Sequence, residues 1–202
     1  MNLRDLRRAA SAGFATAAAL LLWPPSPARA QNVTYSEFRF GILDHDARFL
    51  GGKEKGVDIN PEVNWQSPVS DAWAATVPPW IRWAVQPRPT IGGEINTSGY
   101  TNQAYIGANW AWRLASNVFL PSDGIILGYF FGPGFNDGKI SSTRPDRKSL
   151  GSHVLFREAL DLGYEFMPGW QISAFVDHVS NGGLAKQNQS INDVGARLGV
   201  RF

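Results

Sequence analysis

The stretch Asp193-Val-Gly-Ala-Arg-Leu-Gly-Val-Arg-Phe202 ends the chain with a strict alternation of two kinds of residue. One set is apolar and consists of Val194, Ala196, Leu198, Val200 and Phe202. The other set is charged or glycine and consists of Asp193, Gly195, Arg197, Gly199 and Arg201. Because successive side chains of a β-strand point to opposite faces, a period of two predicts a strand with one apolar and one polar face.

The same period of two recurs upstream along most of the chain. Residues 57–65 and 104–113 alternate in this way, and turn residues separate the alternating segments. We therefore predict an all-β chain of about eight strands, near residues 33–43, 56–65, 88–97, 102–113, 118–135, 151–166, 169–180 and 191–202.

The first residues of the chain have the features of an export signal. A basic start is followed by a short apolar run over residues 13–23 and by the small-x-small sequence Ala28-Arg29-Ala30. The apolar run is too short to span a bilayer with these flanks, although a retained membrane anchor is the alternative. We predict that residues 1–30 are a signal peptide and that residues 31–202 form one domain.

Charge and cysteine content exclude two classes of protein. The predicted signal holds four of the 19 basic residues and one of the 17 acidic residues, so the rest of the chain is nearly neutral. The high isoelectric point of the whole chain is therefore no argument for nucleic-acid binding, and no basic stripe with interleaved aromatic residues supports it. The absence of cysteine excludes a small fold held by disulfides.

An exported chain with about eight alternating strands and a C-terminal aromatic residue is typical of a small outer-membrane barrel. We predict an eight-stranded antiparallel transmembrane β-barrel in the cell outer membrane, with the apolar rows facing lipid. A soluble barrel or sandwich would instead turn the apolar rows inward. Glycine, asparagine and charge in the polar rows favour the membrane barrel, as do tryptophans at segment ends, namely Trp65, Trp80, Trp83 and Trp170.

His178 and Ser180 place a candidate base beside a candidate nucleophile, two residues apart and therefore on one face of a strand. Both continue an apolar row that faces lipid in the predicted barrel. If both termini are periplasmic, this strand ends outside, as do the longer links predicted at residues 44–55, 135–150 and 181–190. The lipid of that leaflet is lipopolysaccharide, whose ester-linked acyl chains would lie beside the pair.

The sequence His178-Val-Ser180-Asn181-Gly-Gly183-Leu184, with Asn188 and the final Arg201-Phe202, resembles the PagL-type lipid A 3-O-deacylases. These are outer-membrane barrels that hydrolyse an acyl ester of lipid A, and the resemblance is strong over residues 171–202. It implies that Ser180 is the nucleophile and His178 its general base. It also implies an oxyanion hole formed by Asn188 and the backbone N–H of Gly183, with Asn181 as a neighbouring residue.

The chain departs from the family at the third catalytic position, where a glutamate is replaced by Asn192. Asn192 shares the outward row of Val194, whereas Asp193 shares the inward row of Arg197 and Arg201 and is expected to pair with those arginines. We therefore predict that Asn192 orients His178. Asp193 is the alternative if a one-residue bulge rotates it outward.

Other candidate sites have weaker support in the sequence. His45 and His153 are isolated from each other and from acidic pairs at ligand spacing, so we predict no metal site. Four cations, Lys139, Arg144, Arg147 and Lys148, cluster in one predicted external link. They are candidates for binding lipid A phosphates, and a solvated polar loop is an equal alternative.

Two classes of function remain open. The first is a serine esterase that hydrolyses the 3-O-linked hydroxyacyl chain of lipid A in the outer leaflet, with no cofactor because a Ser-His mechanism needs none. Its partners would be lipopolysaccharide and outer-membrane lipids. The second is a non-catalytic barrel with a structural or adhesive role. The sequence leaves open whether the barrel forms a homodimer.

Overall fold

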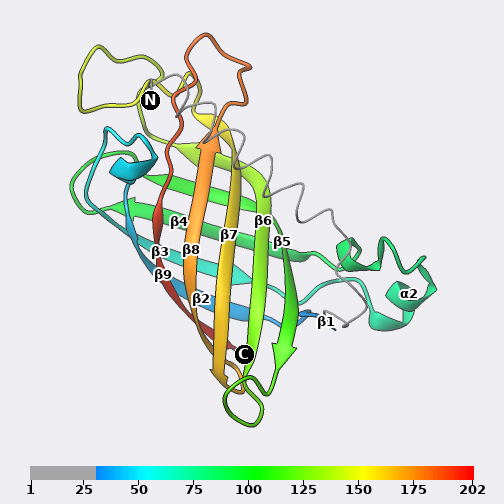
Figure 1. Ribbon diagram of the computed structural model, residues 1–202. Helices are drawn as coiled ribbons and strands as arrows, with labels where there is room; N and C mark the ends of the chain where they lie inside the picture. The colour runs from blue at the N-terminus through cyan, green and yellow to red at the C-terminus, as the bar shows by residue number, and fades with distance from the viewer. Residues whose placement is uncertain (1–30) are drawn as a thin grey trace, which may run out of the picture. The chain divides into compact units, whose positions relative to one another are not determined.

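The computed structural model describes residues 31–202, and the predicted signal peptide lies outside the described residues. Eight antiparallel strands form a closed barrel (Figure 1). They are β2 (Glu37–Asp44), β3 (Val57–Asn64), β4 (Arg88–Asn96), β5 (Gln103–Ser116), β6 (Gly124–Asn136), β7 (Val154–Met167), β8 (Trp170–Ser180) and β9 (Val194–Arg201).

Each strand pairs with its neighbours in sequence, and β2 pairs with β9 to close the ring. The two-residue strand β1 (Gln31–Asn32) pairs with Trp112 and Arg113 of β5. This part of β5 extends past Asn109, which pairs with the first residue of β4. The predicted eight-stranded antiparallel barrel is therefore confirmed.

One predicted strand began too early. Residues 117–123 form a turn rather than the start of β6, because the carboxylate of Asp123 accepts the backbone N–H groups of Val118, Phe119 and Leu120. Asn117 and Ser122 also have positive φ angles of 54° and 71°, which a strand does not allow. The apolar run Val118-Phe119-Leu120 resembles a strand in sequence, but its donors are used within the turn.

The barrel wall is apolar outside and charged inside. Ile172 and Leu198 point outward and are 52% and 43% exposed, whereas Arg157 and Arg197 point inward and are 0% and 2% exposed. The inner charges are paired: Arg157 Nη2 lies 2.6 Å from Glu94 Oε1, and Arg197 Nη2 lies 3.0 Å from Glu62 Oε2. Ion pairing reduces the cost of burying these charges inside the barrel. An apolar outer wall is suited to contact with lipid. The prediction that the apolar rows face outward is confirmed.

The two ends of the barrel differ. Both the start of β2 and the end of β9 lie at one end, which we call the terminal end, where Phe202 N–H donates to Ser36 O at 3.2 Å. The opposite end, which we call the far end, carries the links 45–56, 97–102, 137–153 and 181–193. The prediction that the polar links after β2, β6 and β8 share one end is confirmed.

The terminal end carries one long link among short ones. Residues 65–87 join β3 to β4 and contain the helix α2 (Asp71–Thr76) and the 3-10 turn η2 (Arg82–Ala84). The Ser70 hydroxyl accepts the Trp73 N–H and so caps the start of α2. Figure 1 shows α2 to the side of the strands. Within residues 31–202, no helix has the length and apolar character needed to cross a membrane.

Candidate active site

His178 and Ser180 lie at the far end of β8 on its outward face. The Nε2 atom of His178 is 3.1 Å from Ser180 Oγ, and its Nδ1 atom is 2.7 Å from Asn192 Oδ1. The structure therefore joins a hydroxyl, an imidazole and an amide in one chain of hydrogen bonds, in the order in which a nucleophile, a base and an orienting group are arranged in serine hydrolases.

The register between β8 and β9 decides which residue meets His178. Val176 pairs with Val194, and the bridge between Val179 and Ile191 keeps the same register beyond the end of β9. No residue is inserted between these pairs, so the proposed bulge is absent. Asn192 therefore lies opposite His178 on the outer face, and Asp193 points into the barrel.

Asp193 does not pair with Arg197 or Arg201 as expected. Its Oδ1 atom accepts the backbone N–H of Asp46 at 2.7 Å and lies 3.6 Å from His45 Nδ1. Four residues of strand separate Asp193 from Arg197, roughly 13 Å along the strand, so each side chain binds groups at its own level of the barrel. The alternation gave the correct face for Asp193 but could not identify its partner.

A second contact fixes the orientation of the Asn192 amide. Its Nδ2 group donates to Ser190 Oγ at 3.4 Å, so Oδ1 is the atom directed at the imidazole. Since Oδ1 only accepts, His178 Nδ1 carries the proton and Nε2 presents its lone pair to the Ser180 hydroxyl. This is the tautomer in which His178 can act as a general base towards Ser180.

The groups predicted for the oxyanion hole both contact Asn181. Gly183 N–H donates to Asn181 Oδ1 at 2.9 Å, and Asn181 N–H donates to Asn188 Oδ1 at 3.1 Å. Gly183 N–H is thus occupied in this arrangement, and Nδ2 is the part of Asn188 that can donate to an oxyanion. Gly182 and Gly183 have φ angles of 63° and 83°, so this turn requires glycine. The oxyanion roles stay predictions.

Asn181 contributes more to the site than its sequence position indicates. Its Nδ2 group donates to the carbonyls of Leu150 and Gln187, at 2.8 Å and 2.5 Å. One buried side chain therefore connects the link 137–153 to the link 181–193 directly beside Ser180. Only the position of Asn181 after Ser180 could have drawn attention to it in the sequence.

An apolar pocket of about 450 Å³ opens beside Ser180, and sequence reasoning did not identify it. Phe156 pairs with Ser180 across β7 and β8, and its ring is parallel to that of Phe131 within 9°, with the centroids 6.4 Å apart. The lining residues come from β6, β7 and the adjoining far-end links, and they include Phe131, Pro133, Val154, Phe156, Asn181 and Leu184. A pocket with these walls suits an aliphatic chain.

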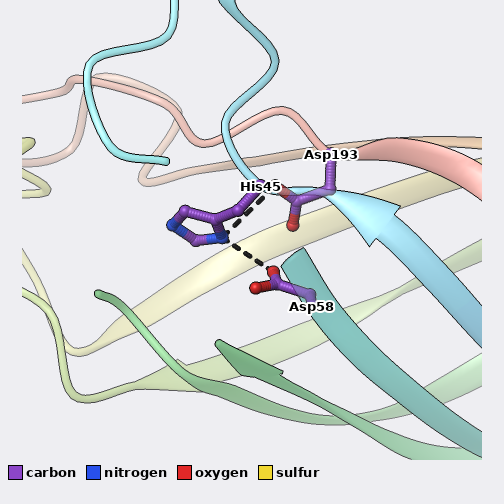
Figure 2. Close-up of side chains that lie close together, drawn as sticks. All are labelled: His45, Asp58 and Asp193. Atoms are coloured by element: carbon purple, nitrogen blue, oxygen red, sulfur yellow. Dashed lines mark hydrogen bonds and ion pairs between the residues drawn. The ribbon is translucent and has the colours of Figure 1, made fainter. Parts of the chain in front are cut away.

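His45 lacks acidic pairs at ligand spacing in the sequence, but the fold places three carboxylates around it. Its Nδ1 atom lies 2.7 Å from Asp58 Oδ2 and 3.6 Å from Asp193 Oδ1 (Figure 2). Its Nε2 atom lies 3.3 Å from Glu54 Oε2. Barrel closure brings these residues together, because Asp44 pairs with both Val57 and Val194. Because these residues are far apart in the sequence, their spacing does not match any metal-ligand motif.

His45, Asp58 and Asp193 lie close enough together for a metal ion, and His45 also forms hydrogen bonds with its carboxylate neighbours. Burial alone would lower the pKa of His45, but hydrogen bonds to Asp58 and Glu54 outweigh it and raise that pKa to about 11. The imidazole is then protonated at neutral pH, and an imidazolium has no lone pair for a metal. The neighbouring carboxylates of Glu94 and Asp177 are bound by Arg157 Nη2, at 2.6 Å and 2.9 Å.

The cations of the link 137–153 are largely engaged within the protein. Lys148 Nζ lies 3.1 Å from Asp46 Oδ1, and Arg147 stacks over the Tyr100 ring at 4.4 Å. Arg144 Nη2 lies 2.7 Å from Asp146 Oδ2. These pairings disfavour the predicted role of this cluster in binding lipid A phosphates. His153 is exposed, and its Nδ1 atom lies 3.0 Å from Asn136 O.

Three solved structures are similar to the chain. The crystal structure of the outer membrane enzyme PagL aligns with a TM-score of 0.59 and 14% sequence identity, over 82% of this chain and 99% of that chain. A de novo designed transmembrane β-barrel aligns with a TM-score of 0.48 and 10% identity, over 86% and 100% of the two chains. Neisserial surface protein A aligns with a TM-score of 0.48 and 12% identity, over 83% and 96%.

Sequence comparison is more specific about the family. No curated protein sequence matches the chain. The family model described as lipid A 3-O-deacylase (PagL) matches residues 72–201, which include β4 to β9 and all the residues of the candidate site. Since the match covers more than half of the sequence, the chain belongs to the PagL family of lipid A 3-O-deacylases.

Proposed function

We propose that this protein is a serine esterase that removes the 3-O-linked hydroxyacyl chain of lipid A in the outer leaflet of the outer membrane. The observation that carries the proposal is the hydrogen-bonded chain of Ser180, His178 and Asn192 on the outer wall of the barrel. Family membership supplies the reaction class, and the apolar pocket beside Ser180 supports an acyl substrate.

The two ends of the barrel support an outer-leaflet location. In outer-membrane barrels the termini are periplasmic and the longer loops are external. The position of both termini makes the terminal end periplasmic, with residues 65–87 as one long periplasmic link, and the far end, with its four links, would be external. His178 and Ser180 face outward near that external rim, where lipid A forms the leaflet.

The proposed reaction follows from the atoms of the site. Ser180 Oγ attacks the acyl carbonyl carbon while His178 Nε2 takes its proton. When the tetrahedral intermediate collapses, the bond to the sugar 3-oxygen breaks, and His178 returns the proton to that oxygen. Water, activated by the same imidazole, then releases the hydroxy acid from Ser180. The acyl chain would lie along Phe131 and Phe156, which fixes the ester beside Ser180.

Asn192 distinguishes this site from the Ser-His-Glu pattern of the family. Its neutral Oδ1 holds the productive tautomer of His178 but adds no full charge opposite the imidazolium that forms. The intact geometry favours an enzyme over the alternative, a non-catalytic barrel that has lost its third catalytic residue. The orientation of the amide by Ser190 supports the same choice.

Mass spectrometry of lipid A tests the proposal. Purified lipid A incubated with the detergent-solubilised protein should lose the mass of one hydroxyacyl chain, and Ser180→Ala should abolish this loss. Ser173→Ala is the matched control, because Ser173 lies on the same strand but faces the interior. Unchanged lipid A with the wild-type protein would favour the non-catalytic barrel. Full conversion by Ser180→Ala would exclude Ser180 as the nucleophile.

A further inference from the structure

The long terminal-end link, residues 65–87, contains four of the eight tryptophans of the chain, and we call it the tryptophan arm. Its tryptophans are Trp65, Trp73, Trp80 and Trp83. Neither barrel closure nor the candidate active site at the far end uses this segment. The proposed esterase therefore does not explain why the arm is there.

The arm packs on the outer wall of the barrel. Trp110 and Trp112 belong to the outward row of β5, and their indole N–H groups donate to Ala84 O at 2.8 Å and Trp83 O at 2.9 Å. Trp112 is only 6% exposed, although outward residues further along β5 such as Ile106 are 53% exposed. The arm therefore occupies wall surface that would otherwise contact lipid.

Several polar side chains of the arm form hydrogen bonds within the arm and with β1. Gln86 Nε2 donates to Asp71 Oδ1 at 2.7 Å, and Asn32 Nδ2 donates to Gln86 Oε1 at 2.7 Å. Arg82 Nη2 donates to the carbonyls of Ala75 and Val77, which lie at the end of α2. A segment next to hydrocarbon must satisfy its polar groups internally in this way.

The outer face of the arm is aromatic and uncharged. Trp80 is 71% exposed and Trp73 is 55% exposed, and no charged residue occurs between Ala72 and Ile81. The turn between β5 and β6, at the same end of the barrel, adds Phe119, which is 76% exposed. Continuity with the lipid-facing wall identifies the occupant of this surface as lipid rather than a protein.

We propose that the tryptophan arm lies in the headgroup region of the leaflet at the terminal end, with Trp73 and Trp80 inserted among glycerophospholipids. Tryptophan prefers this boundary because its ring is largely apolar and its N–H is polar. Anchoring the arm there fixes the depth of the barrel in the bilayer. The inference does not depend on the catalytic role of Ser180.

The absence of cysteine makes a site-specific test possible. Trp80→Cys and, separately, Trp73→Cys are labelled with an environment-sensitive fluorophore in the full barrel, reconstituted in phosphatidylcholine vesicles. Ser141→Cys, in the exposed far-end link 137–153, is the control. We expect the emission of the label to be blue-shifted at both arm positions. Lipids with a nitroxide near the headgroup should quench the label more strongly than lipids with a nitroxide deep in the acyl chain. The control label should respond to neither lipid.

Two labelled positions keep the test decisive if one variant fails to fold. Folding of each variant is checked on a gel, where a folded barrel migrates differently before and after heating. Water-soluble iodide should quench the control label several-fold more strongly than the arm labels. Equal iodide quenching at Trp80→Cys and Ser141→Cys would overturn the proposal and leave the exposed aromatic face for a protein partner. Deep rather than shallow nitroxide quenching would also overturn it, because the arm would then lie in the hydrocarbon core.

Discussion

Replacing Asn192 by aspartate should speed up the proposed reaction. The substitution keeps the size of the side chain, so a carboxylate oxygen replaces Oδ1 at about the observed 2.7 Å from His178 Nδ1. Ser190 Oγ, which accepts from Nδ2 at 3.4 Å, can rotate its hydroxyl and donate to the new carboxylate. The variant therefore changes the charge of the orienting group with little change in its position.

The expected gain follows from the difference between neutral and charged hydrogen bonds. A neutral hydrogen bond contributes about 1 kcal/mol net and a charge-assisted one about 2 kcal/mol. The added stabilisation applies to the imidazolium that forms in the transition state, and Asn192 is 6% exposed, so water screens the pair weakly. A gain of about 1 kcal/mol corresponds to a roughly fivefold higher kcat/KM.

The assay is the initial rate of hydroxyacyl release from detergent-solubilised lipid A. Asn192→Ala should be slower than the wild type, because the hydrogen bond between residue 192 and His178 Nδ1 is then lost. Asn117→Asp, which adds the same charge in the exposed turn at the terminal end, should leave the rate unchanged. A folded Asn192→Asp barrel with a rate at or below that of the wild type would refute the reasoning, and His178 would then need no charged orienter in this site.

Three further results are expected. His178→Ala should abolish deacylation and leave a heat-modifiable barrel, because the side chain is on the outer wall; measurable turnover would rule out His178 as the base. Leu198→Arg should destabilise the barrel in lipid by about 2 to 4 kcal/mol, whereas Leu198→Met should be nearly neutral, as measured by urea titration of folding into vesicles. The raised pKa of His45, about 11 against an ordinary 6.5, implies a contribution to stability that is fully present below about pH 6.5 and is lost as the pH rises towards 11. The unfolding midpoint should therefore fall over this range, and His45→Gln should flatten the dependence; a wild-type profile as flat as that of the variant would contradict it.

The barrel wall was predictable because each strand has one lipid-facing and one interior face. A period of two records that requirement directly, as Val194 to Phe202 illustrates. The turn at residues 117–123 was not predicted, because its apolar run resembles a strand. Nothing in that run indicates that its backbone N–H groups donate to the Asp123 carboxylate. The tryptophan arm escaped prediction for a similar reason, since it has no extended periodic pattern and its carbonyls at Trp83 and Ala84 bind indole groups of β5.

The candidate site was predictable where it depends on strand geometry alone. Period two correctly put Asn192 opposite His178, and the structure shows that the register continues past Val194 without a bulge. Partners supplied by other strands were not predictable, because they depend on closure of the ring. The carboxylates around His45 and the pocket beside Phe156 both depend on it.

The position of Asn192 relative to the barrel seam affects when the enzyme becomes competent. Asn192 precedes β9, and its backbone carbonyl accepts the N–H of Ala47 at 2.8 Å, across the junction where the first long strand meets the last. Until β2 pairs with β9, that bond cannot form, and the segment that carries Asn192 is held beside His178 only by its pairing with β8. Closure of the ring would therefore hold Asn192 more firmly beside His178, so that the proposed esterase reaches its full rate only in the completed barrel.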